Sequence, residues 1–356
     1  MKADTLLDCY RGIYNQPQRW LYYAPSLSST SITTRYPTID KVLKSDENAK
    51  DFVHLYLCAG LKGSIIDKMP NITFRYAHAV STFFLGIYLK NIFKLGPLDQ
   101  HFLYLWFLTC LLHDADYEEE KVGNAKSLRH FYNLHSIEFD LFLDIHTFRC
   151  KGLDENLIKN YFNYRLYACH KMDHGICGGV ILYDALRRQY NDYEKSRSRV
   201  GRCDTPRESF VYGNLLWSRK HWSKYASCAY AIAQHNIWAA DETNISDYMN
   251  FDLNQLTGKI TYKTKLTALL VLCDTIEPIK AFEKCQCPID TLSNLQIKKS
   301  QNSINIKLYH VCGKNNCYST RVMPLENWTN IQVKNDYHPT FCQEIGISQL
   351  TKLYHI

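Results

Sequence analysis

The strongest constraint on the fold is a helical hydrophobic pattern that runs from about residue 49 to residue 283. In the stretch FRYAHAVSTFFLGIYLKNIF, residues on one face recur at helical spacing from Phe74 to Tyr88, and residues 103–114 repeat the pattern. Further helices are expected near residues 127–146, 153–169, 174–191, 221–238 and 262–274. The sequence therefore predicts a mainly α protein.

Both flanks of this region differ from it. Residues 1–48 contain three prolines and the Ser/Thr-rich stretch SLSSTSITT, so we expect an irregular N-terminal arm that packs over the main body. Residues 284–356 contain the short alternating stretches NLQIKKS, SINIKLYHV and TNIQVKN, which are typical of strands. We therefore expect three parts: an arm (1–48), a helical domain (49–283) and a small C-terminal α+β appendage (284–356).

The composition is that of a folded soluble protein, with 46% hydrophobic and 22% charged residues. A net charge of +7 favours an anionic ligand but is too diffuse to indicate nucleic-acid binding by itself. The 14 cysteines, in a chain without an apolar signal segment, predict free thiols in a reducing, cytoplasmic environment. The longest apolar run is too short to span a bilayer, so no membrane segment is expected.

Two polar segments have open interpretations. Residues 191–209 break the helical pattern with several basic residues, and form either a solvated loop or a mobile lid over an anionic ligand. The C-terminal cysteines are spaced C-x-C and C-x4-C, which would permit a zinc knuckle but lacks the C-x2-C pairs that make such a site specific. These cysteines are Cys285, Cys287, Cys312 and Cys317.

Six ionisable residues fall at the ends or inner faces of the expected helices, namely His78, His113, Asp114, His174, His235 and Asp274. Each alone has an ordinary explanation, such as a hydrogen-bonded core histidine or a helix cap. Burying several such groups without partners is costly, whereas a divalent cation would stabilise the cluster. Imidazole and carboxylate ligands suit Mn, Fe, Co, Ni, Zn or Mg, so the residues predict one or two divalent ions without selecting the element.

The order of these residues resembles the HD superfamily of metal-dependent phosphohydrolases, whose pattern is a histidine, an adjacent His–Asp pair and a distant aspartate on a helical bundle. The resemblance covers roughly residues 50–283 and implies an HD-domain bundle. In such a bundle His78, His113, Asp114 and Asp274 would hold one metal ion, and Asp114 would bridge to a second ion held by His174 and His235. Two such ions activate a water molecule and clamp phosphate oxygens during in-line attack.

Arg75 precedes His78 by one helical turn. The R-x-x-H pair is similar to that of HD-type deoxynucleotide triphosphohydrolases, in which the arginine lies near substrate phosphate; a surface salt bridge is the alternative. Lys171 could reach phosphate or stay solvated. The resemblance thus implies catalytic roles for His113, Asp114 and Arg75, and substrate contacts for Arg75 and Lys171.

Residues next to the expected ligands have structural predictions of their own. Asp173 is expected to cap a helix that begins at His174. Three glycines that follow (Gly175, Gly178 and Gly179) would allow a close approach of the backbone to the site or to a neighbouring helix. The run Glu118–Glu120 is expected to be a solvated acidic turn, although Asp116 or Glu118 could orient a ligand histidine.

The chain departs from the family at two points. Members with an HD-GYP signature carry a lysine four positions after the first histidine of the pair, where this chain has Tyr117 and no GYP motif follows. The triphosphohydrolases usually continue after the pair with glycine and histidine, whereas here ADYEEE follows. The resemblance therefore implies a metal site without specifying one substrate.

The sequence predicts a metal-dependent phosphohydrolase that cleaves a phosphoester or phosphoanhydride bond of a nucleotide (a dNTP, a cyclic nucleotide or an oligonucleotide) with a metal-activated water. A free nucleotide is favoured because no long basic stripe is present. An HD-type nuclease for single-stranded nucleic acid is one alternative, supported by the aromatic content and the basic segment. A non-catalytic nucleotide sensor or scaffold is the other. Since many relatives assemble, a homo-oligomer is compatible with this interpretation.

Overall fold

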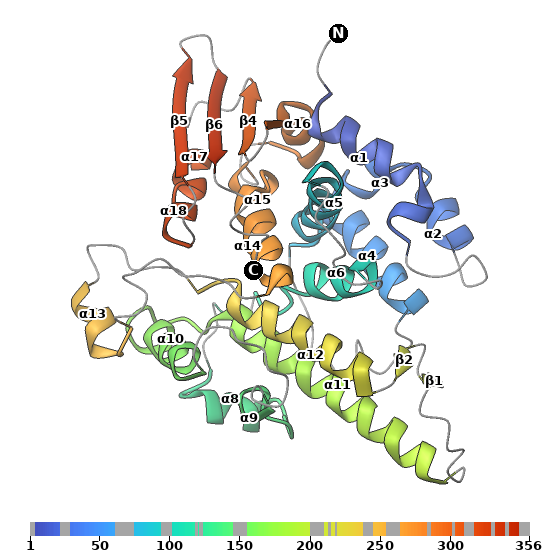
Figure 1. Ribbon diagram of the computed structural model, residues 1–356, viewed down its shortest axis with the longest axis vertical. Helices are drawn as coiled ribbons and strands as arrows, with labels where there is room; N and C mark the ends of the chain where they lie inside the picture. Colours follow the sequence, from blue (N-terminus) through green and yellow to red (C-terminus); the bar gives the residue numbers. More distant parts are fainter. Residues whose placement is uncertain are drawn as a thin grey trace.

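The structure, a computed structural model, is mostly helical with a small antiparallel sheet, which confirms the expected mainly α class (Figure 1). It describes residues 4–21, 29–60, 75–93, 102–117, 120, 124–144, 155–199, 210–212, 215–217, 219–237, 245–253, 264–282, 286–300, 303–309, 317–328, 332–338 and 342–348.

Six helices form the central bundle. They are α4 (Asp46–Gly60), α5 (Tyr76–Phe93), α6 (Phe102–Leu111), α11 (His174–Arg199), α12 (Arg219–Gln234) and α14 (Lys265–Ile276). Helix α5 contacts α4, α6 and α14, and every residue from Tyr76 to Ile87 is buried. A helix that is buried all round has no solvent face and must be covered on every side, which makes α5 the centre of the core.

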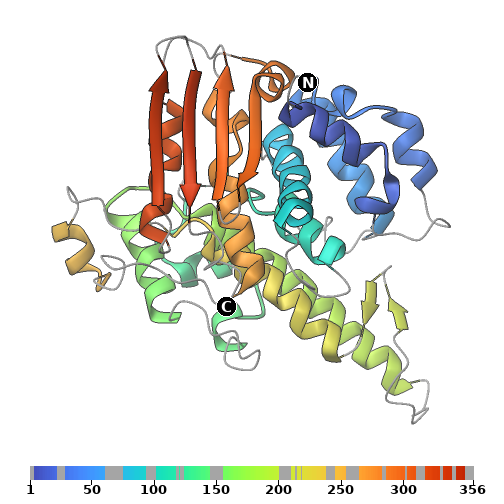
Figure 2. The same cartoon turned by 45° about the horizontal axis from the view of Figure 1, so that its top comes forward.

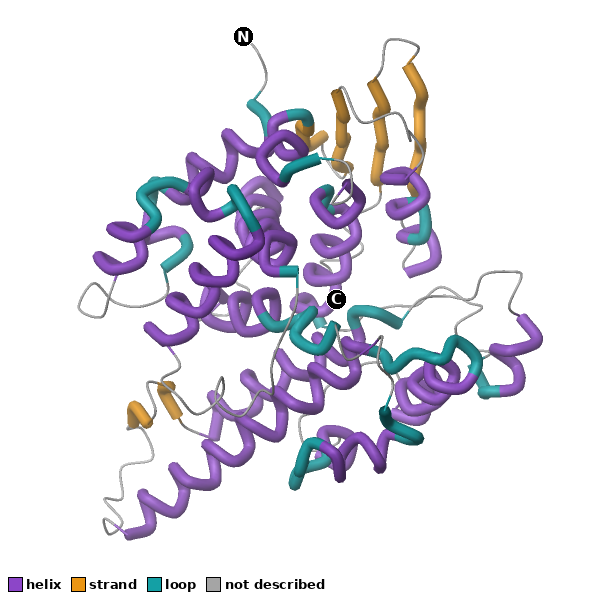
Figure 3. The backbone as a smooth tube through the Cα atoms, turned by 180° about the vertical axis from the view of Figure 1, so that it is seen from behind, coloured by secondary structure: helices purple, strands orange, loops and turns teal. Residues whose placement is uncertain are grey.

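Four further helices lie on one side of this bundle (Figure 1, Figure 3). They are α8 (Leu128–Leu134), α9 (Leu141–Asp144), α10 (Glu155–Tyr167) and α13 (Ile245–Asn250). The helices expected near residues 127–146 and 153–169 correspond to α8, α9 and α10, and those expected from residues 174, 221 and 262 correspond to α11, α12 and α14.

Helices α11 and α12 lie side by side because glycine lets them approach closely (Figure 1). A Cβ atom on Gly179 would lie 2.6 Å from the Ala229 carbonyl oxygen. A Cβ atom on Gly175 would lie 2.9 Å from the imidazole of His235. Around Gly178 the nearest atom is 3.8 Å away. The expected close approach is therefore confirmed for Gly175 and Gly179.

Replacing Gly179 by alanine is expected to lower the free energy of unfolding by about 1–3 kcal/mol, because the added methyl group must push apart two helix backbones. The matched control is Gly178→Ala, where space exists and alanine's higher helix propensity should leave stability unchanged or raise it by about 0.5–1 kcal/mol. Urea unfolding followed by circular dichroism measures both. Equal stability of the two variants would contradict the packing described here.

The N-terminal region is helical, so the prediction of an irregular arm is wrong. It contains α1 (Leu6–Tyr14), the 3-10 turn η1 (Pro17–Arg19), α2 (Ser29–Arg35) and α3 (Ile39–Val42). Thr5 caps α1 in a capping box with Asp8, and the Tyr10 hydroxyl donates to the Ser81 carbonyl oxygen of α5 at 2.9 Å. Pro17 begins η1 and Pro37 follows α2, so these prolines separate helices rather than prevent them. Pro25 lies outside the described residues.

The C-terminal region contains a four-stranded antiparallel sheet with the order β3-β4-β6-β5 (Figure 2). The strands are β3 (Leu295–Ser300), β4 (Ser303–Tyr309), β5 (Gln332–His338) and β6 (Cys342–Ser348). Three were expected from their alternating pattern, whereas β6 was not. Ile297, Ile306 and Ile345 are cross-strand neighbours on the buried face, while Lys307 pairs with Glu344 at 3.1 Å on the other.

Four short helices connect the sheet to the bundle: α15 (Ile279–Phe282), α16 (Pro288–Ser293), α17 (Cys317–Val322) and α18 (Leu325–Trp328). Helix α17 packs on α14 and α15, and strand β3 packs on α1. The Tyr88 hydroxyl of α5 donates to the Ile297 carbonyl oxygen at 3.0 Å. The buried apolar residues of the N-terminal helices, the bundle and the sheet form one continuous core, and the three-part division of the chain stays a prediction.

Helix α11 continues to Arg199, so the expected break at residue 191 is wrong for residues 191–199. Asp192, Glu194 and Lys195 are exposed on this last part of the helix, which extends past the end of α12 in Figure 1. A helix that leaves the core needs no apolar stripe, and this explains its polar sequence. Short strands β1 (Phe210–Tyr212) and β2 (Leu215–Trp217) pair with each other nearby. Residues 200–209, with Arg202 and Arg207, lie outside the described residues.

Seven described cysteines are free thiols, as predicted, and Cys110, Cys228 and Cys273 among them are buried in the core. Cys285 and Cys312 of the suggested zinc knuckle lie outside the described residues. The Cys287 thiol is exposed and donates a hydrogen bond to Asp290. Within the described part of the chain, no helix combines the length and the apolar composition needed to cross a bilayer.

Candidate metal centre

The six expected ligands come together at the ends of five helices. His78 lies in the first turn of α5, His113 and Asp114 follow α6, His174 begins α11, His235 follows α12 and Asp274 lies in the last turn of α14. All six residues are buried, with at most 3% of their surface exposed. Three of the helices present their C-terminal ends, whose partial negative charge favours a cation.

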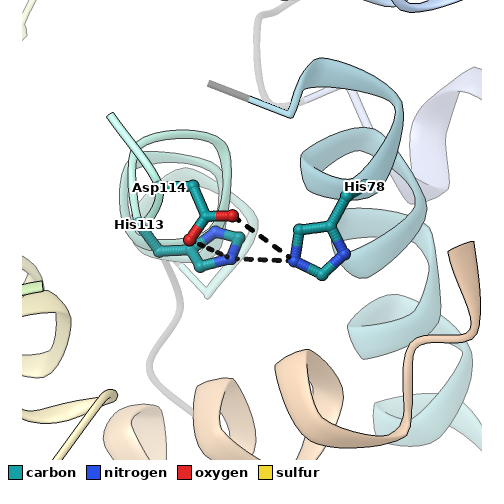
Figure 4. A group of neighbouring side chains, drawn as sticks. All are labelled: His78, His113 and Asp114. Carbon is teal, nitrogen blue, oxygen red and sulfur yellow. Dashed lines mark hydrogen bonds and ion pairs between the residues drawn. The ribbon is translucent and has the colours of Figure 1, made fainter. Parts of the chain in front are cut away.

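Asp114 lies at the centre of the cluster. Its Oδ1 atom is 3.1 Å from His174 Nε2, 3.4 Å from His113 Nε2 and 4.0 Å from His235 Nε2. Its Oδ2 atom is 3.7 Å from His78 Nε2 (Figure 4). One carboxylate therefore faces four imidazoles, and its two oxygens could both serve as metal ligands.

Asp274 faces the same imidazoles from the end of α14. Its Oδ1 atom is 2.8 Å from His78 Nε2 and 3.5 Å from His113 Nε2, and these two nitrogens are 3.3 Å apart. Three overlapping groups of ligand atoms each fit within 4.8 Å: His78, His113 and Asp114; His113, His235 and Asp274; and Asp114, His174 and His235. The six residues thus offer positions for more than one ion.

Every histidine of the cluster is oriented through its Nδ1 atom. His78 Nδ1 lies 2.5 Å from Glu277 Oε2, and His174 Nδ1 lies 2.7 Å from Glu120 Oε2. A carboxylate accepts hydrogen bonds, so Nδ1 carries the proton in both histidines. This carboxylate–histidine pairing is the arrangement by which proteins orient metal-bound imidazoles.

The other two histidines use backbone carbonyls for the same purpose. His113 Nδ1 donates to the Cys110 carbonyl oxygen at 2.6 Å, and His235 Nδ1 donates to the Ile232 carbonyl oxygen at 2.7 Å. These carbonyls belong to the last turns of α6 and α12, where few intrahelical partners remain. All four Nε2 atoms consequently point to the centre, where their lone pairs can bind a metal.

Several buried polar atoms of the cluster lack full hydrogen bonding among the described residues. Asp114 Oδ2 and His235 Nε2 have no hydrogen-bond partner, whereas Asp114 Oδ1 and His174 Nε2 form an ion pair with each other at 3.1 Å. Buried polar atoms without a partner are rare in proteins, because each loses its hydration without compensation. A divalent cation of the kind that accepts nitrogen and oxygen ligands would satisfy all four, so the residues fit a metal site.

Protonation of the histidines differs across the cluster. Burial lowers the pKa of His174, but the adjacent Asp114 and Glu120 carboxylates outweigh this effect and raise it to about 10. Burial likewise opposes protonation of His78, and the charge of Glu277 together with hydrogen bonds to Asp274 and Glu277 raises its pKa. For His235, burial and the neighbouring His113 and His174 lower the pKa to about 3. Without a metal, protons on His174 and His78 balance the buried carboxylates.

Metal binding at pH 7 is therefore expected to release at least one proton. His174, with its pKa near 10, is protonated at pH 7 and must lose that proton before Nε2 can bind a cation. Affinity should consequently rise with pH up to about 10. Calorimetric titration with Mn²⁺ in buffers of different ionisation enthalpy counts the protons. The Glu120→Gln variant, which lacks one of the carboxylates that raise the pKa of His174, should release fewer protons on binding Mn²⁺. If the unaltered protein released no proton, His174 would not be a metal ligand that is protonated at pH 7.

A cavity of about 360 Å³ opens next to the cluster on the side of His174 and Asp274. It is lined by Tyr117, Glu120, Arg165, Lys171, His174, Asn236, Asp274, Lys280, Arg321 and Pro324. Four of these side chains are lysine or arginine, and two are carboxylates, Glu120 and Asp274. The cavity thus suits a polar anion, with the expected Lys171 exposed at its edge.

Two of the cations also contact the carboxylates of the cluster. Lys280 Nζ lies 3.3 Å from Asp274 Oδ1 and 3.9 Å from Asp114 Oδ2, and Arg321 Nη2 lies 3.5 Å from Asp274 Oδ1. Burial raises the pKa of Asp114 and Asp274, but Lys280 and the neighbouring histidines hold both well below the usual range. Both aspartates are therefore ionised and ready to bind a cation.

Arg75 reaches the cavity through Tyr117. Its guanidinium donates to the Tyr117 hydroxyl and lies 4.0 Å from the centre of that ring. The Tyr117 ring in turn stands edge-on to His174, with 5.3 Å between ring centres. Arg75 is not among the residues that line the cavity, so its contact with the site runs through the tyrosine at the position where the sequence departs from HD-GYP proteins.

The sequence interpretation missed four residues of the site: Glu120, Glu277, Lys280 and Arg321. The expectation of a solvated acidic turn is wrong for Glu120, which is buried between His174 and Arg165 and accepts a hydrogen bond from each. Asp116 is also buried, and Glu118 lies outside the described residues. A signal for Glu277 was available, since it follows Asp274 by three positions and so returns to the same side of the chain.

The Asp173 cap is confirmed, because its Oδ1 atom accepts from the Ile176 amide at 2.8 Å at the start of α11. With this cap and the Gly175 contact, the start of α11 is fixed beside His235. The buried histidines and aspartates could hold a metal ion beside a cavity with a basic lining. No protein-family model, curated protein or solved structure matches the chain.

Proposed function

We propose that this protein is an HD-type metal-dependent phosphohydrolase that acts on a nucleotide. The observation that carries the proposal is the convergence of four Nε2 atoms and two carboxylates beside a cavity lined by four cations. The order of the ligands along the chain supports the resemblance to HD-type proteins. A bound divalent cation would supply Lewis-acid polarisation of a phosphoryl oxygen and a water nucleophile at neutral pH.

The residues of the chain would divide the remaining work. His78, His113 and Asp274 would hold one cation, His174 and His235 a second, and Asp114 would bridge them. Glu277 and Glu120 fix the tautomers of His78 and His174, so that Nε2 faces the centre before any ligand arrives. Such pre-organisation lowers the reorganisation needed when charge develops on the phosphoryl group.

The cavity supports a small phosphorylated substrate. Arg165 lies beside His174 through Glu120, while Lys280 lies beside Asp274, so cations flank the cluster on both sides. Guanidinium and ammonium groups at these positions would contact phosphate oxygens. A volume of about 360 Å³ is in the range of small-molecule sites and supports a mononucleotide rather than a long single strand.

A panel of nucleotides incubated with Mn²⁺, Co²⁺, Ni²⁺ or Mg²⁺, with products separated by chromatography, tests the proposal. We expect release of phosphate, pyrophosphate or triphosphate from at least one mononucleotide, and none after chelation. Degradation of labelled oligonucleotides with mononucleotides untouched would favour a nuclease. Tight nucleotide binding without turnover, even with Mn²⁺ present, would instead indicate a sensor or scaffold.

A further inference from the structure

The helix that carries Asp274 is capped by residues from the C-terminal region. At the end of α14 the Tyr318 hydroxyl donates to the Ile276 carbonyl oxygen at 2.6 Å. Arg321 Nη2 donates to the Asp274 carbonyl oxygen at 2.6 Å, and Arg321 Nε donates to the Thr275 carbonyl oxygen at 3.2 Å. Three successive carbonyls that a helix end would leave unpaired are thus satisfied by α17.

Arg321, unlike Tyr318, also lines the cavity beside the six candidate ligands, together with Pro324 from the turn that follows α17. Its Nη2 atom lies 3.5 Å from Asp274 Oδ1, on the carboxylate that faces His78 and His113. A guanidinium has five donors in a planar fork, and the two backbone contacts use only part of this capacity.

We propose that the C-terminal sheet region completes the active centre, and that Arg321 is the residue by which it does so. Arg321 holds the end of α14, and with it Asp274, while its guanidinium binds a phosphate oxygen of the substrate in the cavity. It is a positioning residue toward Asp274 and a binding residue toward phosphate. The phosphate part rests on the proposed function, whereas the positioning part rests on the contacts described above.

The charges around the cavity support this division of work. Arg165 is paired with Glu120, and Lys280 lies close to both aspartates of the cluster. Once cations neutralise Asp114 and Asp274, Lys280 and Arg321 lose their nearest anionic partners and present net positive charge to the cavity. A planar guanidinium anchored at a helix end then offers a fixed, directional contact to phosphate at little entropic cost.

The test measures binding of inorganic phosphate to the Mn²⁺-loaded full-length protein by calorimetry, for the unaltered chain and three variants. Arg321→Gln should bind phosphate about tenfold more weakly, and raise KM more than it lowers kcat, because a charge-assisted hydrogen bond is lost. Arg321→Lys keeps the charge without the fork, and should bind phosphate about threefold more weakly. Tyr318→Phe removes a cap from the same helix end outside the cavity, and should leave phosphate affinity unchanged.

Phosphate affinity unchanged in both Arg321 variants would overturn the inference. So would an equal loss in Tyr318→Phe and Arg321→Gln, because Arg321 would then act as a helix cap alone. If Arg321→Gln does not fold, the comparison of Arg321→Lys with Tyr318→Phe decides by the same criterion. A protein that binds Mn²⁺ and phosphate through Arg321 but hydrolyses no nucleotide would contradict the proposed function and leave this inference standing.

Discussion

Asp114→Asn is expected to abolish metal binding and, with it, hydrolysis. Asp114 faces all four imidazoles, and its buried Oδ2 atom has no hydrogen-bond partner in the described part of the chain. An amide is a weak ligand and carries no charge, so the bridging position is lost. Removing one member of a unit that acts together lowers activity by about 10³-fold or more.

The same substitution also affects the metal-free protein. Asp114 pairs with protonated His174 at 3.1 Å, and removing one partner of a buried ion pair is destabilising, so the metal-free variant should melt at a lower temperature than the unaltered chain. Added Mn²⁺ should raise the melting temperature of the unaltered protein and leave that of Asp114→Asn unchanged. The control is Asp173→Asn, since asparagine also caps helices and Asp173 lies outside the cluster. If Mn²⁺ also raised the melting temperature of the Asp114→Asn variant, Asp114 would not be an essential ligand of the metal site.

Glu277 is the residue whose replacement should affect stability and metal affinity together. It is fully buried, orients His78 through Oε2, and accepts from the Ile279 amide at 2.9 Å through Oε1. Glu277→Ala leaves these donors unpaired in the core and is expected to cost about 3–5 kcal/mol of folding free energy. Glu277→Gln keeps an acceptor but loses the charge, and should weaken metal binding about 10–100-fold.

Metal titration and urea unfolding of the two variants separate these effects. Asp184→Asn is a suitable control, because Asp184 also accepts from two backbone amides, those of Glu138 and Phe139, but orients no histidine. It should change stability without changing metal affinity. A Glu277→Gln variant with the metal affinity of the unaltered protein would show that His78 is oriented by other contacts.

The ligands of the site could be found from the sequence because each stands near the beginning or the end of a helical run. His113 and Asp114 follow the run of α6, and Asp274 closes that of α14. A helix end directs a polar side chain away from its own apolar face and toward other helix ends, so separate local signals converge. The sequence could not give the distances between the ligand atoms, because these distances depend on how the five helices pack against one another.

The residues that orient or supplement the ligands were harder to find for a physical reason. Glu120 belongs to a run of three glutamates, and only its tertiary contacts with His174 and Arg165 distinguish it from a solvated neighbour. Arg321 lies in a polar segment far along the chain, and its role depends on how the sheet packs on the bundle. The N-terminal helices were missed because the prolines there indicate where an element begins or ends, but not whether the residues between them form a helix.

The docking of α17 on α14 sets an order of events during synthesis. Helix α14 leaves the ribosome before α17 does, so a nascent chain that has reached only residue 316 lacks the partners of the Asp274, Thr275 and Ile276 carbonyls. Helix α1, which is synthesised before both, must also wait for strand β3 and helix α16 to cover its flank. The end of the helix that carries Asp274 is therefore completed only after α17 has been synthesised.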